Sequence, residues 1–253
     1  MALNYASLAA TALKLIGENG KNVTIRKSEP AVAVDALKPW RTDTANTFAV
    51  VVKAVEHPYT QYEVDDKVIT KGDTRLYVAA DAFELAAAAQ DVAAAQTLTL
   101  TNQPVHAETV AVGGKVYTFE TVLTNVDGRV LIGATTEDSL DHLVAAVNLG
   151  AGAGTPYAAL TTLHPTVSAT DGTGLTVVFT AKTAGVAGNA ITTTETLTFG
   201  SFGGVTLAGG YTVSRALEDY NFVTFASEKW RIMKANPIRP AEIVVLYDLQ
   251  CRR

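Results

Sequence analysis

Hydrophobic and polar positions alternate with a short period in the first 88 residues and the last 40. Residues 3–16 instead place Leu8, Ala12 and Leu15 on one helical face, and Gly17 and Gly20 follow as a stop signal. The remaining apolar runs predict strands, which cover residues 23–27, 47–55, 61–70, 74–80, 222–225, 229–235 and 242–250. One helix with about six strands favours a small antiparallel β-barrel or sandwich.

Turn-forming residues and prolines between these runs predict how the strands connect. Lys71-Gly72-Asp73 is a short turn that would join strands 61–70 and 74–80 into a hairpin. A second turn is expected at residues 226–228. Pro237 and Pro240 predict an end to strand pairing, because proline has no amide hydrogen to donate.

The middle of the chain follows a different pattern. Gly113-Gly114 lies between two strand-like runs and predicts a two-residue hairpin, and Asp171-Gly172 predicts another turn. Residues 135–148 predict an amphipathic helix that Thr135 caps together with Asp138 and that Gly150 ends. A sheet with one helix packed across it, an α+β arrangement, accounts for this part.

Composition changes at both ends of this middle part. Residues 89–213 hold 3 Lys+Arg, 9 Asp+Glu and 25 Thr, whereas the flanking parts hold 17 Lys+Arg and 16 Asp+Glu. This predicts a discontinuous β domain, residues 1–88 with 214–253, interrupted by an inserted domain, 89–213, with its core at 97–210. The alanine-rich run 84–96 is expected to form a short, sparsely anchored helix that acts as a semi-rigid joint.

Few residues suggest chemistry. Four histidines are scattered without a second ligand at metal spacing, and the glycines of 150–156 follow a helix rather than precede one, unlike a phosphate loop. No nucleophile stands in a catalytic pattern. We therefore expect no catalytic residue, no metal and no cofactor, and a protein that is not an enzyme.

Charge and hydropathy narrow the classes further. A net charge of −5 argues against a chain that wraps nucleic acid. The single cysteine, Cys251, excludes an internal disulfide and fits a reducing compartment. No secretory signal is visible, and the longest uncharged stretch, 143–170, is too polar to cross a bilayer, so we expect a soluble protein without membrane contact.

The two flanking parts, read together, carry a recognisable pattern. It includes "LAATALKLIGENGKNVTIRK", "YTQYEVDDKVITKGDTRLYVAA" and a C-terminal stretch that contains Asp219, Trp230, Ile232, Pro237, Pro240, Tyr247, Leu249, Gln250 and Arg252. This pattern resembles the head-closure, or stopper, proteins of tailed bacteriophages. Two positions depart from it: the glycine before the tryptophan strand is replaced around Ser227-Glu228, and the Ile-Asp-Gly hairpin tip reads Val64-Asp65-Asp66.

The middle part resembles a module of phage virion proteins, including tail components. The residues that carry this likeness are "VAVGGKVYTFE", "IGATTEDSLDHLVAAVN", "FTAKTAGVAGNAITTTET" and "GGVTLAGG". The resemblance implies a decoration on the outside of the particle rather than a catalytic unit.

Together the resemblances imply a structural virion protein of the phage neck, assembled in the host cytoplasm. It would form a sixfold or twelvefold ring of identical copies below the portal and adaptor, close the head, retain DNA that it touches without sequence specificity, and dock a tail terminator or tail tube. The residues implied at interfaces are Asp219, Trp230, Ile232, Pro237, Pro240, Tyr247 and Arg252.

The candidate lumen-facing loop is acidic and consists of Tyr62, Glu63, Val64, Asp65, Asp66 and Lys67. An acidic lining would keep DNA from sticking as it leaves, since basic residues are what bind phosphate by releasing counterions.

Two alternatives stay open. One is a tail-completion or tail-tube (terminator) ring protein. The other is a host-attachment or carbohydrate-binding virion protein, which predicts that aromatic residues of the inserted domain form one face; those available are Tyr117, Phe119, Tyr157, Phe179, Phe199 and Phe202.

Overall fold

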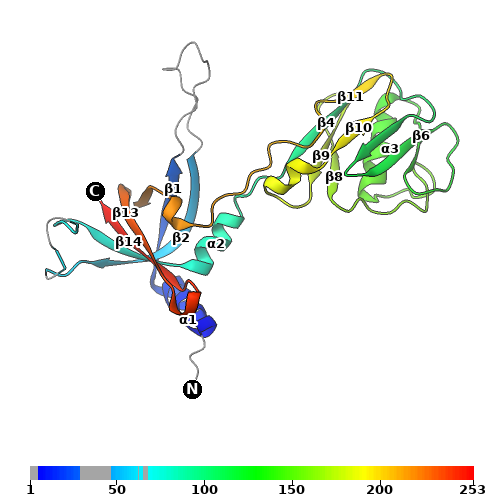
Figure 1. Ribbon diagram of the computed structural model, residues 1–253. Helices are drawn as coiled ribbons and strands as arrows, with labels where there is room; N and C mark the ends of the chain where they lie inside the picture. Colours follow the sequence, from blue (N-terminus) through cyan, green and yellow to red (C-terminus); the bar gives the residue numbers. More distant parts are fainter. Residues whose placement is uncertain (1–4, 29–46, 62, 65–67) are drawn as a thin grey trace, which may run out of the picture. The chain divides into compact units, whose positions relative to one another are not determined.

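The chain folds into two compact units. The computed structural model describes residues 5–61, except 29–46, then 63, 64 and 68–253. One unit comprises Met1–Gln90 with Val213–Arg253, and the other comprises Asp91–Thr212 (Figure 1). Both borders lie within two residues of the positions at which the composition changes.

The first unit is a closed antiparallel barrel of six strands. Its elements are α1 (Tyr5–Asn19), β1 (Lys21–Ser28), β2 (Thr47–Pro58), β3 (Thr74–Ala79), α2 (Ala80–Ala88), β12 (Phe222–Phe225), β13 (Glu228–Ile238) and β14 (Leu246–Arg252). The strands close in the order β1-β12-β13-β14-β3-β2. Closure leaves no open sheet edge. The predicted fold class, a mainly β protein with an N-terminal helix, is confirmed.

Alternating residues of these strands fill the barrel. The buried side chains include Val23, Ile25, Val50, Val52, Leu76, Val78, Val223 and Leu249. Helix α1 adds Ala9 and Ile16, whereas Leu8 and Leu15 are about half exposed. The buried face of α1 is thus rotated from the face that the hydrophobic pattern suggests.

The described residues of the predicted strand 61–70, which are 61, 63, 64 and 68–70, do not lie in a strand. Strand β2 pairs directly with β3, and the last opposed residues are Pro58 and Thr74. In the closed barrel β3 already lies between β2 and β14, so a further strand has no hydrogen-bonding partner there. The segment between these two strands, residues 59–73, is called here the β2–β3 connection.

The two prolines act differently from the prediction. Strand β13 continues through Pro237, which lies opposite Tyr247 of β14. Pro240 begins a short 3₁₀ helix, Pro240–Glu242, at the first helical position where proline loses no bond. The break in register comes earlier, between Ile232 and Lys234.

The alanine-rich run divides between the two units. Phe83 of α2 is fully buried and packs edge-on against Tyr220 and Tyr247, at ring-centroid distances of 5.2 and 6.2 Å. At its other end, Ala95 begins β4 of the inserted unit. The helix thus covers only the first part of the run 84–96, ending at Ala88, and Phe83, which precedes the run, anchors it in the barrel's core. The role of the run as a joint stays a prediction.

The inserted unit has two four-stranded sheets and one helix. Its elements are β4 (Ala95–Leu100), β5 (Thr109–Val112), β6 (Lys115–Glu120), β7 (Arg129–Leu131), α3 (Thr136–Asn148), β8 (Val167–Asp171), β9 (Thr176–Ala181), β10 (Thr193–Glu195) and β11 (Gly200–Phe202). The sheet orders are β10-β5-β6-β7 and β11-β4-β9-β8. Both sheets and α3 contribute to one hydrophobic core, so the expected single sheet is divided in two.

Local signals in this unit predict its elements well. Gly113 and Gly114 have φ of 56° and 83° and join β5 to β6. The Thr135 hydroxyl accepts a hydrogen bond from the Asp138 amide, and the Asp138 carboxylate accepts one from the Thr135 amide. The helix ends at Asn148 as expected, but Leu149 rather than Gly150 takes the left-handed conformation that follows it (φ 53°). Among the described helices, none has the length and apolar character needed to span a membrane.

The turn between β12 and β13 holds two side-chain-bearing residues in the left-handed region. Ala226 has φ of 49° and Ser227 has φ of 63°. This is the turn at which the resembled pattern has a glycine. For a residue with a side chain, this backbone conformation costs roughly 1 kcal/mol more than it does for glycine.

Replacing Ser227 with glycine should therefore stabilise the barrel unit by about 0.5 kcal/mol, after allowance for the extra freedom of glycine in the unfolded chain. Urea unfolding, followed by tryptophan fluorescence, measures this change. Ala10→Gly on the exposed face of α1 is the matched control and should instead cost about 1 kcal/mol. Destabilisation by both variants would contradict the assignment of strain to this turn.

Candidate functional site

The β2–β3 connection carries the acidic loop that the sequence suggests. Tyr62, Asp65, Asp66 and Lys67 lie outside the described residues. Glu63 and Val64 are described, and both are partly buried. The connection can therefore be characterised by how the barrel holds its two ends.

Arg75 of β3 holds the first end. Its Nη2 lies 3.0 Å from Glu63 Oε1, and its guanidinium carbon lies 4.4 Å from the centre of the Tyr59 ring. Arg75 Nε also lies 3.3 Å from Asp248 Oδ1 of β14, an ion pair without hydrogen-bond geometry. One guanidinium thus joins both flanks of the connection's first turn to the barrel wall.

Glu63 is also bonded within its own turn. Its Oε2 accepts hydrogen bonds from the Thr60 amide (2.9 Å) and the Thr60 hydroxyl (2.8 Å). These bonds, and then the contact with Arg75, lower the pKa of Glu63 to about 2. The carboxylate is consequently an acceptor committed to the local fold.

Asp73 holds the second end. Its Oδ1 and Oδ2 accept hydrogen bonds from Arg252 Nε (2.8 Å) and Nη2 (2.9 Å), and Gln250 Nε2 donates to Oδ2 at 2.8 Å. The same two side chains of β14 donate to the carbonyl of Val68. Bidentate Arg–carboxylate pairs of this kind fix geometry as well as charge.

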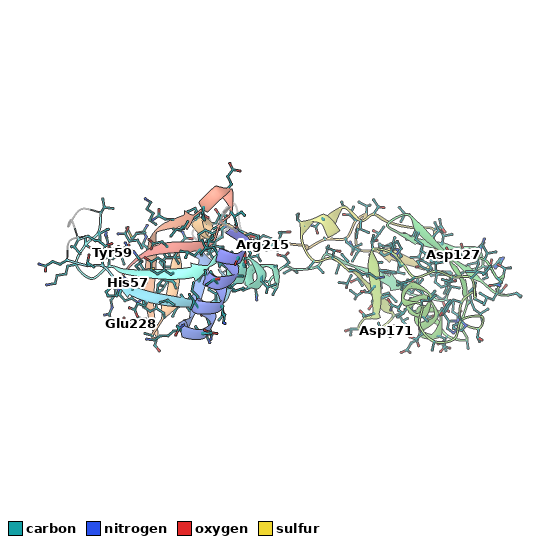
Figure 2. The ribbon with its side chains drawn as sticks, turned by 90° about the horizontal axis from the view of Figure 1, so that it is seen from below. His57, Tyr59, Asp127, Asp171, Arg215 and Glu228 are labelled. Carbon is teal, nitrogen blue, oxygen red and sulfur yellow. The ribbon has the colours of Figure 1, made fainter. Side chains whose placement is uncertain are left out.

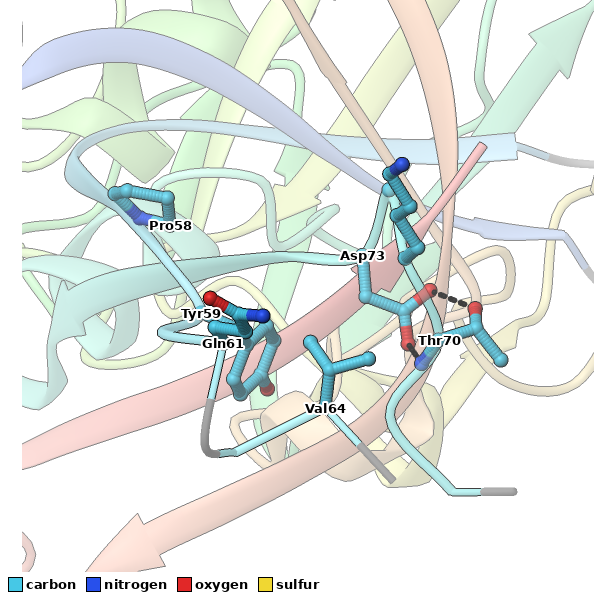
Figure 3. A pocket seen from close by; sticks show the side chains of 8 residues that line it. Pro58, Tyr59, Gln61, Val64, Thr70 and Asp73 are labelled. Carbon is cyan, nitrogen blue, oxygen red and sulfur yellow. Dashed lines mark hydrogen bonds between the residues drawn. The ribbon is translucent and has the colours of Figure 1, made fainter. Parts of the chain in front are cut away.

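The Asp73 carboxylate is completely shielded from solvent. It also accepts bonds from the Thr70 amide and hydroxyl, which close the turn before β3 (Figure 3). The bond from Arg252 is the largest cause that holds the pKa of Asp73 well below its usual range. Asp248 differs: burial raises its pKa, and Arg75 only partly offsets that effect.

A hollow of about 760 Å³ lies between the two ends of the connection. It is lined by Pro58, Tyr59, Gln61, Val64, Thr70, Lys71, Gly72 and Asp73 (Figure 3). The carboxylates nearby are already neutralised by arginine. Among the described residues, no three His, Cys, Asp or Glu side chains gather as a metal site would require. The arrangement is suited to holding a loop in place.

The residues of the head-closure-like pattern lie in several places. Trp230 stacks on Phe225 with ring centroids 5.0 Å apart, and Tyr247 is buried against Phe83. Ile232 is half-buried and its amide donates to the Asn221 carbonyl, and Asp219 accepts a bond from the Ser214 hydroxyl. Among the described residues of this pattern, Gln250 and Arg252 bond to the β2–β3 connection.

Sequence reasoning missed Arg75 and Asp248. Both lie on strands at outward positions, where a charged residue is ordinary. The position of Arg75 beside the connection and Asp248 can be predicted only when β14 is known to be the neighbour of β3. No signal in the sequence alone identifies that neighbour.

Two other polar residues have structural roles. His164 is fully buried: its Nε2 lies 2.9 Å from the Val112 carbonyl, and its Nδ1 accepts bonds from the Thr166 and Val167 amides. Cys251 is buried in the barrel, and burial raises the pKa of its thiol to about 12. A protonated, inaccessible thiol is a poor nucleophile.

The aromatic residues of the inserted unit do not form an exposed face. Tyr117, Phe119, Tyr157 and Phe179 are buried, Phe202 is partly buried, and only Phe199 of the six is exposed, at 40 %. These six residues therefore do not form the exposed aromatic face that is expected of a carbohydrate-binding surface.

Comparison with known proteins gives no family assignment: no protein-family model and no curated protein sequence matches the chain.

Replacing Asp73 with asparagine should destabilise the barrel unit by roughly 2 kcal/mol at neutral pH, because Arg252 loses its buried partner. The pKa of Asp73 is lowered by folding, so its contribution is present above the unfolded value near 4 and is lost as the pH falls below it. Urea unfolding at pH 7, 4 and 3 should thus show a smaller acid-induced loss for Asp73→Asn than for the wild type. Asp81→Asn, an exposed position on α2, serves as control, and equal pH profiles for Asp73→Asn and the wild type would refute this role.

Proposed function

We propose that this chain is a structural protein of the neck of a tailed bacteriophage. It forms a homo-oligomeric ring below the portal and adaptor, closes the head, retains the packaged DNA and docks the tail. The observation that carries the proposal is the closed barrel whose β2–β3 connection is tied down at both ends by charged side chains. The likeness of the flanking sequences to head-closure proteins supports it.

A ring that retains DNA needs an element that projects from a rigid base. In this barrel, Arg75 and Arg252 hold the two ends of the connection, and β14 supplies Asp248 and Gln250 as further partners. The segment between these anchors includes Asp65 and Asp66 and is called here the acidic tip. A tip with several negative charges would narrow a channel without binding the phosphates that pass it.

The inserted unit suits a separate task. It has its own core, and the chain enters it at Gln90–Asp91 and leaves it at Thr212–Val213. A unit of this kind can decorate the outside of a ring without altering the barrel that builds the ring. The neighbours in this proposal are identical copies in a sixfold or twelvefold ring, the adaptor or portal above, and a tail terminator or tail tube below.

Particles assembled without this protein distinguish the candidate functions. Loss of head closure should give heads that package DNA, then lose it, and carry no tails, as seen by electron microscopy and by nuclease sensitivity of the packaged genome. Supplying the wild-type protein in trans should restore full particles. Tailless heads that keep their DNA would instead indicate tail completion, and complete particles that fail to adsorb would indicate host attachment.

The acidic tip gives a finer test. Asp65→Asn with Asp66→Asn should change the rate or extent of DNA ejection, since two charges that repel phosphate are removed, while ring assembly persists. Asp81→Asn with Glu84→Gln removes the same charge from exposed positions of α2 and should leave ejection unchanged. Time-resolved light scattering of receptor-triggered particles measures the rate. Identical ejection by both variants and the wild type would exclude a gating role for the tip.

A further inference from the structure

A row of cations crosses the outer face of three neighbouring barrel strands. Arg26 of β1 lies opposite Phe222 of β12, and Phe222 lies opposite Arg231 of β13. Opposed residues on adjacent strands share a face. The alternate residues Val23, Ile25 and Val223 are buried, so Arg26 and Arg231 point away from the core.

Lys229 completes this row. It lies opposite Thr224, and its Nζ is 3.9 Å from the centre of the Phe222 ring. Arg26, Lys229 and Arg231 are all exposed and are called here the basic strip. In the part of the chain that the structure describes, no carboxylate forms an ion pair with any of the three. The strip is thus a set of cations free to meet an anionic partner.

The inserted unit has the opposite charge. Residues 91–212, all of which are described, contain three cations and nine carboxylates. Each cation is engaged within the unit: Lys115 lies 3.1 Å from Asp127, Arg129 lies 3.1 Å from Glu120, and Lys182 donates to the His164 carbonyl at 2.5 Å. The surface charge of this unit is consequently negative.

Helix α3 presents part of that negative charge on one side. Glu137 and Asp141 are exposed and stand one helical turn apart. No residue of the described chain pairs with either in an ion pair, whereas Asp138 between them is occupied by the helix cap. Asp171, labelled in Figure 2, is a further exposed carboxylate of this unit.

We propose that the basic strip of one copy binds the acidic side of α3, Glu137 and Asp141, on a second copy. Charge complementarity carries this choice, because each chain supplies both surfaces in equal number. A polyphosphate fits less well: it would approach a chain of net charge −5, and Lys229 covers the Phe222 ring on which a base would stack.

The two surfaces differ, so the contact is heterologous. Such contacts close into a ring when the rotation between copies permits it, and otherwise propagate as a filament. The inference rests on the proposed function only in taking self-assembly as the work of the chain. It adds which surfaces meet.

A charge-swap experiment tests the pairing. Variant A carries Arg26→Glu and Arg231→Glu, and variant B carries Glu137→Lys and Asp141→Lys. The wild type should self-associate at 50 mM salt and dissociate as salt rises, because exposed charge pairs are screened. Each variant alone should associate at least roughly tenfold more weakly. An equimolar mixture of A and B should recover association, since the reversed strip of A meets the reversed α3 of B and both original surfaces also remain available.

Sedimentation velocity of the full chain measures these states, and circular dichroism checks that every variant is folded. Lys14→Glu with Lys21→Glu makes the same charge change as A at other exposed positions and should associate like the wild type. The proposal is overturned if the wild type stays monomeric, if A associates normally, or if the mixture stays dissociated. It is also overturned if A loses binding to duplex DNA while keeping self-association.

A failure of this contact can be distinguished from a failure of the proposed function. Recovery in the mixture together with filaments that never close would retain the contact and count against a neck ring. Neck rings visible in particles made with A would retain the function and exclude this contact.

Discussion

The barrel depends on the pairing of β3 with β14. These strands come from opposite sides of the inserted unit, and six opposed residue pairs, from Leu246–Ala79 to Cys251–Thr74, join them. Without this ladder the sheet is open and two strands expose unpaired edges. Every part of the candidate site also depends on it, since Arg75 and Asp73 come from the β3 side, and Asp248, Gln250 and Arg252 come from β14. Closing the barrel and fastening the β2–β3 connection are one event.

This dependence explains what the sequence can and cannot reveal. Elements defined by local chemistry are predicted correctly: the capped helix that begins after Thr135, the Gly113-Gly114 hairpin and the strand 222–225. Elements defined by distant partners are not. Residues 61–70 alternate like a strand, yet β3 has no free side to receive them, and Phe83 is a core residue only because Tyr220 and Tyr247 arrive from the C-terminal part. The acidic loop can be recognised in the sequence, whereas the two arginines that hold its ends can be recognised only in the folded structure.

Charge is distributed between the two units by different rules. In the barrel, arginines occupy outward strand positions, some paired, as Arg252 with Asp73, and some exposed, as Arg26 and Arg231. In the inserted unit, the few cations make contacts within the unit, and threonine is the commonest polar residue of the strands. Polar β-branched residues keep such strands soluble without fixing a net positive charge.

The two chain crossings into the inserted unit run beside each other. Val92 bridges Tyr211, and Ala95 bridges Ala208, so the first and last residues of the unit are held about 5 Å apart by main-chain pairing. The two ends of the insertion are therefore as close together as the ends of a tight turn, whatever the length of the insertion. A unit whose ends are paired in this way can be gained, exchanged or lost as a whole, and the barrel keeps the same strand order throughout.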